Sequence, residues 1–179
     1  MVDANIIHGV SLEAKDAEHL LSASPSAVLD VLVTSGVPVC ADEAGVIEGE
    51  WRDCCDPDWI DNWFLTFVSL ANFQVLPTSP QPFLLKRLQL DCGFPKSRDR
   101  VLVITSIAAS THFGRCMLLT EDMDFYEPAD KVTPPARRAK YMRGELKGRV
   151  KRHLDASVNV DVESVVLATS ALQGPRRVP

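Results

Sequence analysis

With 179 residues, 46% of them hydrophobic and 24% charged, the chain is long and apolar enough for one compact domain with a sizeable core. This composition excludes a disordered chain, and no apolar run reaches the roughly 20 residues that span a bilayer. The N-terminus carries Asp3 where a signal peptide would be positively charged, so we expect a soluble, cytoplasmic protein without a membrane partner.

The net charge of −5 conceals an asymmetry along the chain. Residues 1–127 carry 8 Lys and Arg against 19 Asp and Glu, whereas residues 128–179 carry 11 against 5. An acidic body with a basic segment is typical of a protein that collects cations at carboxylates and contacts a polyanion elsewhere. The alternative is a solvated basic helix held to the acidic body by its opposite charge.

The elements are predicted in chain order from apolar periodicity, caps and turn residues. In the first half, we expect strands at residues 2–7, 37–41 and 73–76, and helices at 12–21, 27–33, 43–54 and 56–72. In the second half, we expect a helix at 83–91, a helix or strand at 101–109, a strand at 116–120, a basic helix at 136–154, a strand at 158–162 and a flexible tail at 174–179.

Strands separated by helix-length crossovers indicate a mostly parallel sheet that is covered on both faces. We therefore expect an α/β fold, a three-layer α/β/α sandwich around about five strands. Residues 1–126 would form its core, and the basic helix and last strand would complete a single domain. Ligands of such folds bind at the carboxyl ends of the strands.

Several acids are expected at that edge of the sheet. Asp3 lies in the first predicted strand, near the end of the few residues available, and Asp122 comes two residues after a predicted strand. Glu50 lies in the helix after the second strand, and Asp99 would enter the first turn of a helix at 101–109. Clustered carboxylates repel one another unless hard divalent cations such as Mg²⁺ or Mn²⁺ neutralise them. Such ions activate water and neutralise an attacked phosphate, which suits a chain without a G-x-S-x-G motif.

Two of these assignments have competitors. Glu43 and Glu48 lie on the same predicted helix as Glu50, and Glu43 shares its face. If residues 101–109 formed a strand, Asp99 would lie at the wrong end of the sheet.

Three segments resemble the PIN-domain family. Residues 2–6 (V-D-A-N-I) match its D-x-N opening, residues 42–51 (D-E-A-G-V-I-E-G-E-W) resemble a D-E-x-G-x-I-x-x-E-[YW] stretch, and residues 118–125 (L-L-T-E-D-M-D-F) resemble an L-x-T-x-D-x-D-F motif. Residues 97–100 (S-R-D-R) stand where a third acid is expected. The resemblance covers roughly residues 1–126.

The resemblance implies a PIN-like fold and metal-dependent hydrolysis of RNA. The implied ligands of Mg²⁺ or Mn²⁺ are Asp3, Glu50, Asp99, Asp122 and Asp124, of which the first four would be catalytic. Asn5 would fix the rotamer of Asp3, and Thr120 would orient Asp122 or a water. Family members are mostly ribonucleases, many of them toxins, so the implied partners are an RNA substrate, an antitoxin or other regulatory protein, and a second copy of the chain.

Basic side chains are the candidates for phosphate contacts. Near the acids these are Arg98, Arg100 and Arg115, and along the basic helix they are Arg138, Lys140 and Arg143. Two other functions stay open: an inactive PIN-like interaction module, and another metal-dependent phosphohydrolase. The latter class often carries an aspartate pair D-x-D at its first strand, where this chain has Asp3-Ala4-Asn5.

The five cysteines include no C-x-x-C pair, so zinc-type spacing is absent. Adjacent Cys54 and Cys55 leave redox chemistry as an alternative, but reduced, partly buried thiols are the favoured interpretation.

Overall fold

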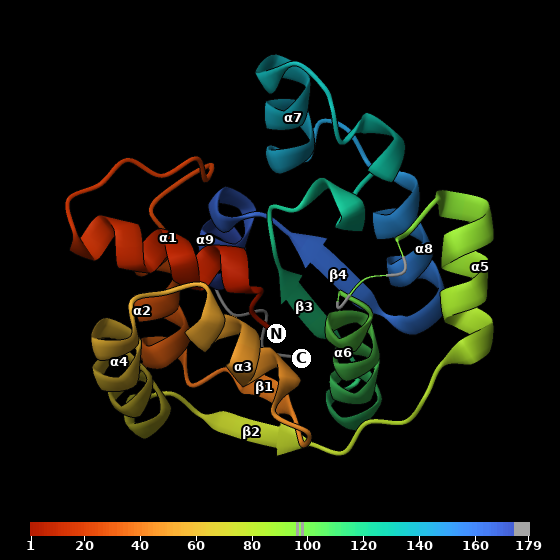
Figure 1. The fold of residues 1–179 in the computed structure, drawn as a ribbon. Helices are drawn as coiled ribbons and strands as arrows, with labels where there is room; N and C mark the ends of the chain where they lie inside the picture. Colours follow the sequence, from red (N-terminus) through yellow and green to blue (C-terminus); the bar gives the residue numbers. More distant parts are fainter. Residues whose placement is uncertain (96, 98, 174–179) are drawn as a thin grey trace.

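The fold is mixed α/β, and the computed structural model describes residues 1–95, 97 and 99–173 (Figure 1). Arg98 and the tail predicted at 174–179 lie outside the described residues. In chain order the elements are α1 (Ala4–Ala14), α2 (Pro25–Ser35), β1 (Val39–Asp42), α3 (Val46–Asp53), α4 (Pro57–Leu70), β2 (Phe73–Leu76), α5 (Pro82–Cys92), α6 (Arg100–Phe113), β3 (Cys116–Leu119), the 3₁₀ turns η1 (Met123–Phe125) and η2 (Pro128–Asp130), α7 (Pro135–Met142), α8 (Arg149–Val158), β4 (Val160–Glu163) and α9 (Val165–Gln173).

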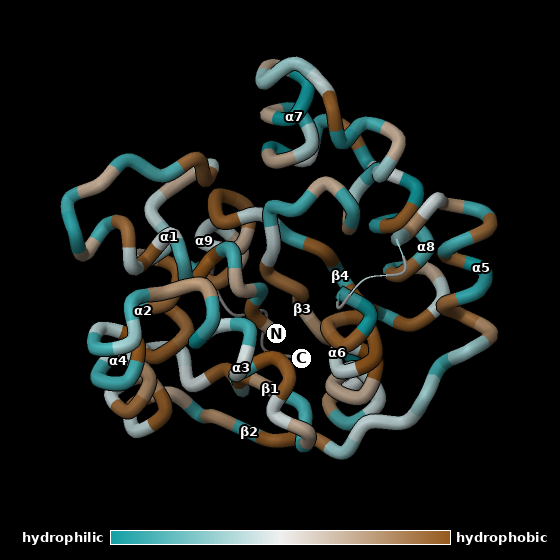
Figure 2. Tube along the Cα trace, viewed as in Figure 1, coloured by the Kyte–Doolittle hydropathy of each residue, from teal (hydrophilic) through white to brown (hydrophobic). Residues whose placement is uncertain are grey.

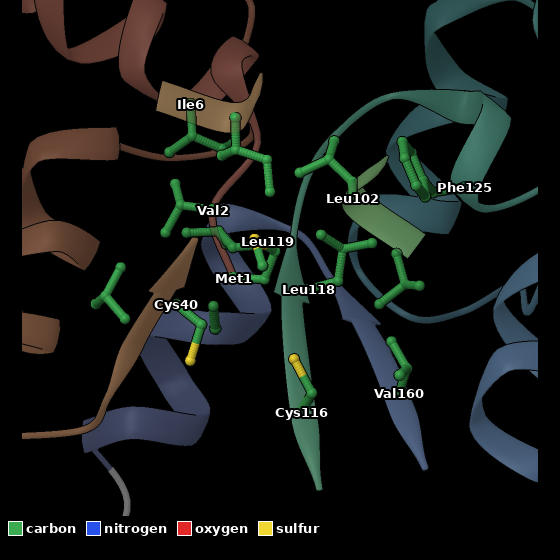
Figure 3. Close-up of a cluster of buried hydrophobic side chains, with 14 of the residues drawn as sticks. Met1, Val2, Ile6, Cys40, Leu102, Cys116, Leu118, Leu119, Phe125 and Val160 are labelled. Atoms are coloured by element: carbon green, nitrogen blue, oxygen red, sulfur yellow. The ribbon is translucent and has the colours of Figure 1, made fainter. Parts of the chain in front are cut away.

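The strands pair in parallel, β1 with β2 and β3 with β4. A single parallel bridge joins Val2 to Leu119, and the Asp3 amide donates to the Leu119 carbonyl at 3.0 Å. Figure 3 shows Met1 and Val2 between Cys40 of β1 and Leu119 of β3. The predicted α/β class with parallel pairing is confirmed. In the described residues, however, hydrogen bonding gives two pairs and one bridge instead of a continuous sheet of about five strands.

The predicted strand at 2–7 and helix at 12–21 are wrong, because the first helix begins earlier. Helix α1 starts at Ala4, and its residues Ile6, Ile7 and Val10 stand at helical spacing and are buried on one face. The helix ends at Ala14, and Asp16 then adopts a positive φ of 52°. Only Met1, Val2 and Asp3 are left for the sheet.

The predicted basic helix at 136–154 is divided into α7 and α8. Gly144 between them has a φ of +72°, which ends a helix readily because glycine has no Cβ penalty there. A Cβ on Gly148 would lie 1.9 Å from the Tyr126 carbonyl oxygen, so the backbone passes directly against Tyr126 at this point. Helix α9 was not predicted.

Several other helices begin or end at capping residues or at a glycine. Ser24 caps α2 with Pro25 in its first turn, and Asp56 caps α4 by accepting from the Trp59 amide at 3.2 Å. Gly93 ends α5 in the left-handed conformation. The run at 101–109 belongs to helix α6, which removes the strand alternative.

Buried apolar side chains form one cluster around the strands. Helix α6 contacts all four strands, α2 packs against α1 and α9, and α8 packs against β4. Figure 2 shows hydrophobic residues gathered along β1 and β3, at the centre of the molecule. Within the described part of the chain, no helix combines the length and the apolar character needed to cross a membrane.

Candidate metal centre at the carboxylates

Asp3 stands at the junction of the N-terminal extended segment and helix α1. Its backbone is in the N-cap conformation, but its side chain makes no capping hydrogen bond. The carboxylate instead accepts from the Thr120 hydroxyl and, at 2.9 Å, from Asn5 Nδ2. Asn5 Nδ2 also lies 3.3 Å from Thr120 Oγ1. The contact of Asn5 therefore matches the role expected for it, to hold Asp3 in one rotamer, whereas Thr120, which was expected to orient Asp122 or a water, contacts Asp3 as well.

Thr120 also connects Asp3 to the acids after β3. Its Oγ1 accepts from the Asp122 amide at 3.0 Å, and Asp122 Oδ1 accepts from the Asp124 amide at 2.9 Å. The second bond caps the 3₁₀ turn η1. Because each bond joins residues two positions apart, this part of the site is fixed by local backbone geometry.

Three of the predicted acids line one open depression of about 420 Å³. Asp3, Glu50 and Asp99 contribute to its wall, together with Asp53 and Ser97. Asp99 holds the N-cap position of α6, and its carboxylate accepts from the Ser97 hydroxyl. Glu50 comes from α3, one turn before the end of that helix. Asp3, Asp99 and Glu50 thus reach the depression from three different helices.

Burial and mutual repulsion perturb these carboxyl groups. Burial raises the pKa of Asp3 from 3.8 to about 7, and the charges of Asp122 and Asp99 add to this increase, while the Thr120 hydrogen bond opposes it. Burial also raises the pKa of Asp99, with further increases from Asp122 and Asp124. The five predicted acids therefore include four that interact electrostatically in the folded chain.

Lys131 is a counter-ion of these acids that was not predicted from the sequence. Its Nζ forms an ion pair with Asp124, which is buried, while the lysine side chain itself is more than half exposed. Asp122, Asp124 and Asp99 all contribute to raising the pKa of Lys131, after the direct hydrogen bond to Asp124. Lys131 therefore stays charged and neutralises part of the cluster.

The donor set fits a hard divalent cation. Asp3, Glu50, Asp99 and Asp122 offer carboxylate oxygens, which Mg²⁺ and Mn²⁺ prefer. Among the described residues, no three of these acids bring their oxygens within 4.8 Å of one another. Without side-chain movement, therefore, at most two of these acids could ligate one ion directly, and waters would fill the other positions.

The basic residues predicted to contact phosphates are scattered. Arg100 lines a separate depression beside α5. Arg115 pairs with Asp161 and directly precedes β3, whereas Asp122 follows the other end of that strand. Arg138, on α7, donates to the Glu121 carbonyl at 2.7 Å, directly before Asp122. Helix α7 also carries Lys140 and is followed by Arg143, and Arg138 and Arg143 line a depression beside Glu121 that is separate from the one lined by Asp3, Glu50 and Asp99.

The alternative for the basic segment also has support in its ion pairs. Arg137 pairs with Asp130 and Arg149 with Glu127 at 2.6 Å each, and Lys151 pairs with Asp161 at 2.7 Å. Of these three pairs, Arg149–Glu127 joins the segment to residues 1–127, whereas the other two lie within residues 128–179.

Of two charged residues that were not predicted at the site, one could have been found from the sequence and the other could not. Asp53 lies three positions after Glu50, so helical spacing alone places both on one face of α3. Lys131 lies between the turn η2 and α7, where no periodicity relates it to Asp124.

The chain matches no family model, no curated protein and no solved structure in the comparisons made with it.

Proposed function

We propose that the chain is a PIN-like, metal-dependent endoribonuclease that hydrolyses phosphodiester bonds of RNA. The observation that carries this proposal is the meeting of Asp3, Glu50 and Asp99 in one open depression, with Asp122 linked to Asp3 through Thr120. The PIN-like sandwich is part of the same proposal. A continuous five-stranded sheet would require the segment at Met1–Asp3 to pair with β1 as well as with β3.

The acids and their neighbours have the following roles in this proposal. Asp3, Glu50, Asp99 and Asp122 hold Mg²⁺ or Mn²⁺, and Asp124 contributes as a further ligand or through a water. A bound ion of this kind supplies an activated water and neutralises charge on the attacked phosphate. Asn5 and Thr120 keep the Asp3 carboxylate oriented, so its oxygens do not have to be ordered when the cation arrives.

The support for a polyanionic substrate comes from α7. Arg138 lies against Glu121, next to Asp122, and Lys140 and Arg143 extend the positive charge along the same element. An RNA strand bound there would run past the carboxylates. The PIN resemblance of the three sequence motifs favours RNA, and single-stranded DNA is the alternative substrate.

The test compares RNA cleavage by the wild type, Asp3→Asn and Asp58→Asn with Mg²⁺, with Mn²⁺ and with EDTA. Asp58 is exposed on α4 and serves as a matched Asp-to-Asn control. We expect EDTA to abolish cleavage, Asp3→Asn to lower the rate at least about 100-fold, and Asp58→Asn to leave it unchanged. Equal cleavage by Asp3→Asn and the wild type would contradict the proposal.

Two further readouts separate the rival functions. Hydrolysis of an aryl phosphate without RNA cleavage would indicate a different phosphohydrolase. If the folded wild type cleaves neither substrate, calorimetric titration with Mn²⁺ decides between an intact metal site that needs a partner and an interaction module without such a site.

A further inference from the structure

A second cluster of metal-ligating side chains lies beside the carboxylates. A ring nitrogen of His8, Cys54 Sγ and Cys55 Sγ all lie within 4.8 Å of one another. The two sulfur atoms are 3.5 Å apart. His8 comes from the middle of α1, while Cys54 and Cys55 follow directly on the end of α3.

The spacing of the two sulfur atoms suits a tetrahedral ion of zinc size. Zinc–sulfur bonds of about 2.3 Å at the tetrahedral angle place two thiolate sulfurs about 3.8 Å apart. The 3.5 Å between Cys54 Sγ and Cys55 Sγ is close to that value. Three protein ligands leave the fourth position for a water, and the exposed side of His8 gives solvent access to it.

The contacts of His8 favour the same interpretation. His8 Nδ1 lies 2.7 Å from the carbonyl oxygen of Cys54. Because a carbonyl only accepts, this contact assigns the proton to Nδ1 and leaves the basic lone pair on Nε2. Histidines that ligate metals usually donate their other ring N–H to such a backbone carbonyl or to a carboxylate.

The chemistry of the two clusters differs. Thiol and imidazole ligands select soft or borderline cations such as Zn²⁺, whereas the all-oxygen set selects Mg²⁺ and Mn²⁺. Cys54 lines the same depression as Asp3 and Glu50, so the two clusters are neighbours without sharing a ligand type.

We propose that His8, Cys54 and Cys55 form a zinc site that fastens α1 to the end of α3. The thiol of Cys54 already contacts the Ala4 carbonyl at 3.5 Å, so the two helices meet at this point. Asp3 precedes α1 and Glu50 lies one turn before Cys54, so the zinc holds together the two helices that position these acids. The zinc site does not depend on the nuclease proposal.

The test titrates Zn²⁺ and Co²⁺ into the metal-free full chain under reducing conditions. The variants are Cys54→Ser/Cys55→Ser and His8→Gln, with His112→Gln as a matched exposed histidine and Asp3→Asn to disable the carboxylate cluster. We expect one equivalent of Co²⁺ to give thiolate-to-cobalt charge-transfer absorption in the wild type, His112→Gln and Asp3→Asn. Zinc affinity should fall at least about 100-fold in the double variant and at least about 10-fold in His8→Gln.

Thermal unfolding supplies the structural readout. Zn²⁺ at about 100 times its wild-type Kd should raise the Tm of the wild type by roughly 5–10 °C, and should raise the Tm of His8→Gln by at most about half as much at the same concentration. His8 is exposed, so its variant is expected to fold even if the double variant does not. Absence of thiolate absorption, or zinc affinity that survives in His8→Gln and disappears in Asp3→Asn, would overturn the proposal.

Discussion

The carboxyl group of Asp3 is stable as an acid in the folded chain, because burial opposes its ionisation. Its pKa of about 7 is raised above the ordinary value of 3.8. Below pH 4 this carboxyl group is protonated in both the folded and the unfolded chain, and the free energy of unfolding is highest. As the pH rises towards 7, the group ionises readily in the unfolded chain but not in the folded one, so the free energy of unfolding falls. Over the whole interval the loss is about 4 kcal/mol, since one pKa unit corresponds to about 1.4 kcal/mol.

Asp3→Asn should therefore remove a pH-dependent cost. Between pH 5 and pH 8 in EDTA, we expect the free energy of unfolding of the wild type to fall by about 3 kcal/mol more than that of Asp3→Asn. Urea denaturation at several pH values measures the difference, with Asp58→Asn as the control that should follow the wild type. Parallel stability curves for Asp3→Asn and the wild type would show that Asp3 ionises without cost.

Lys131 supplies positive charge where a divalent cation would bind. Its ion pair with Asp124, and its attraction to Asp122 and Asp99, lower the negative charge that an incoming ion meets. Lys131→Gln should therefore bind Mn²⁺ about fivefold more tightly, the effect of roughly 1 kcal/mol of repulsion removed at a partly exposed site. Calorimetry measures the affinity, with Lys86→Gln on α5 as the control, and weaker binding by Lys131→Gln would indicate that the lysine organises the acids.

At the scale of elements, the packing of α8 depends on one glycine. Gly148 precedes α8, and a Cβ there would lie 1.9 Å from the Tyr126 carbonyl oxygen, a backbone atom that cannot move aside. We expect Gly148→Ala to lower the free energy of unfolding by at least about 3 kcal/mol. Gly49→Ala is the matched control, because Gly49 lies within α3 with nothing within 4 Å of an added Cβ.

The control should change stability in the opposite direction. Alanine is favoured over glycine inside a helix by roughly 0.5–1 kcal/mol, so Gly49→Ala should stabilise the chain. Chemical denaturation of both variants measures the two changes in the free energy of unfolding. Equal effects of the two substitutions would mean that the backbone at Gly148 relaxes away from Tyr126.

Elements whose ends carry capping residues or terminating glycines could be predicted from the sequence, and those that depend on tertiary pairing could not. Asp56 and Gly93 mark helix ends by a hydrogen bond or by their conformation, and these ends are found in the structure. The helix predicted from residue 27 begins earlier, at Pro25, where Ser24 caps it. By contrast, Ile6 and Ile7 suit a strand or a helix equally well by residue type. Only the burial of Val10 on the same face decides for a helix.

The same division applies to the carboxylates. Asp99 and Asp122 each follow or precede a predicted element at the carboxyl side of the strands, so their approach could be anticipated from topology. Asp3 was predicted within a strand at 2–7, whereas it precedes helix α1. The pairing of Lys131 with Asp124 depends on how the irregular segment between η2 and α7 folds back, and no periodicity describes such a segment.

For the molecule as a whole, the separation of charge gives the proposed RNA interaction its dependence on salt. Each phosphate contact with a single strand contributes about 0.7 to the slope of log affinity against log salt concentration. If Lys140 and Arg143 both contact phosphates, Lys140→Gln/Arg143→Gln should reduce the magnitude of that slope by about 1.4 without altering Mn²⁺ affinity. RNA binding is measured in the Asp3→Asn background to prevent cleavage.

The control removes the same charge elsewhere. Lys86→Gln/Arg87→Gln neutralises two residues of α5 and should leave the slope unchanged. A slope that falls equally in both double variants would indicate a general effect of net charge, and one that falls in neither would place the RNA on another surface.

The bond between Asp3 and Thr120 joins residues 117 positions apart, and this separation sets when the carboxylate site can appear during biosynthesis. The chain leaves the ribosome from its N-terminus at about 5–20 residues per second, so Asp3 waits roughly 6–23 s before Thr120 is made. Val2 meets its strand partner Leu119 only at that stage, and β3 meets β4 later still. A nascent chain shorter than 120 residues therefore cannot form this bond, and Asp3 stays without its Thr120 partner until then.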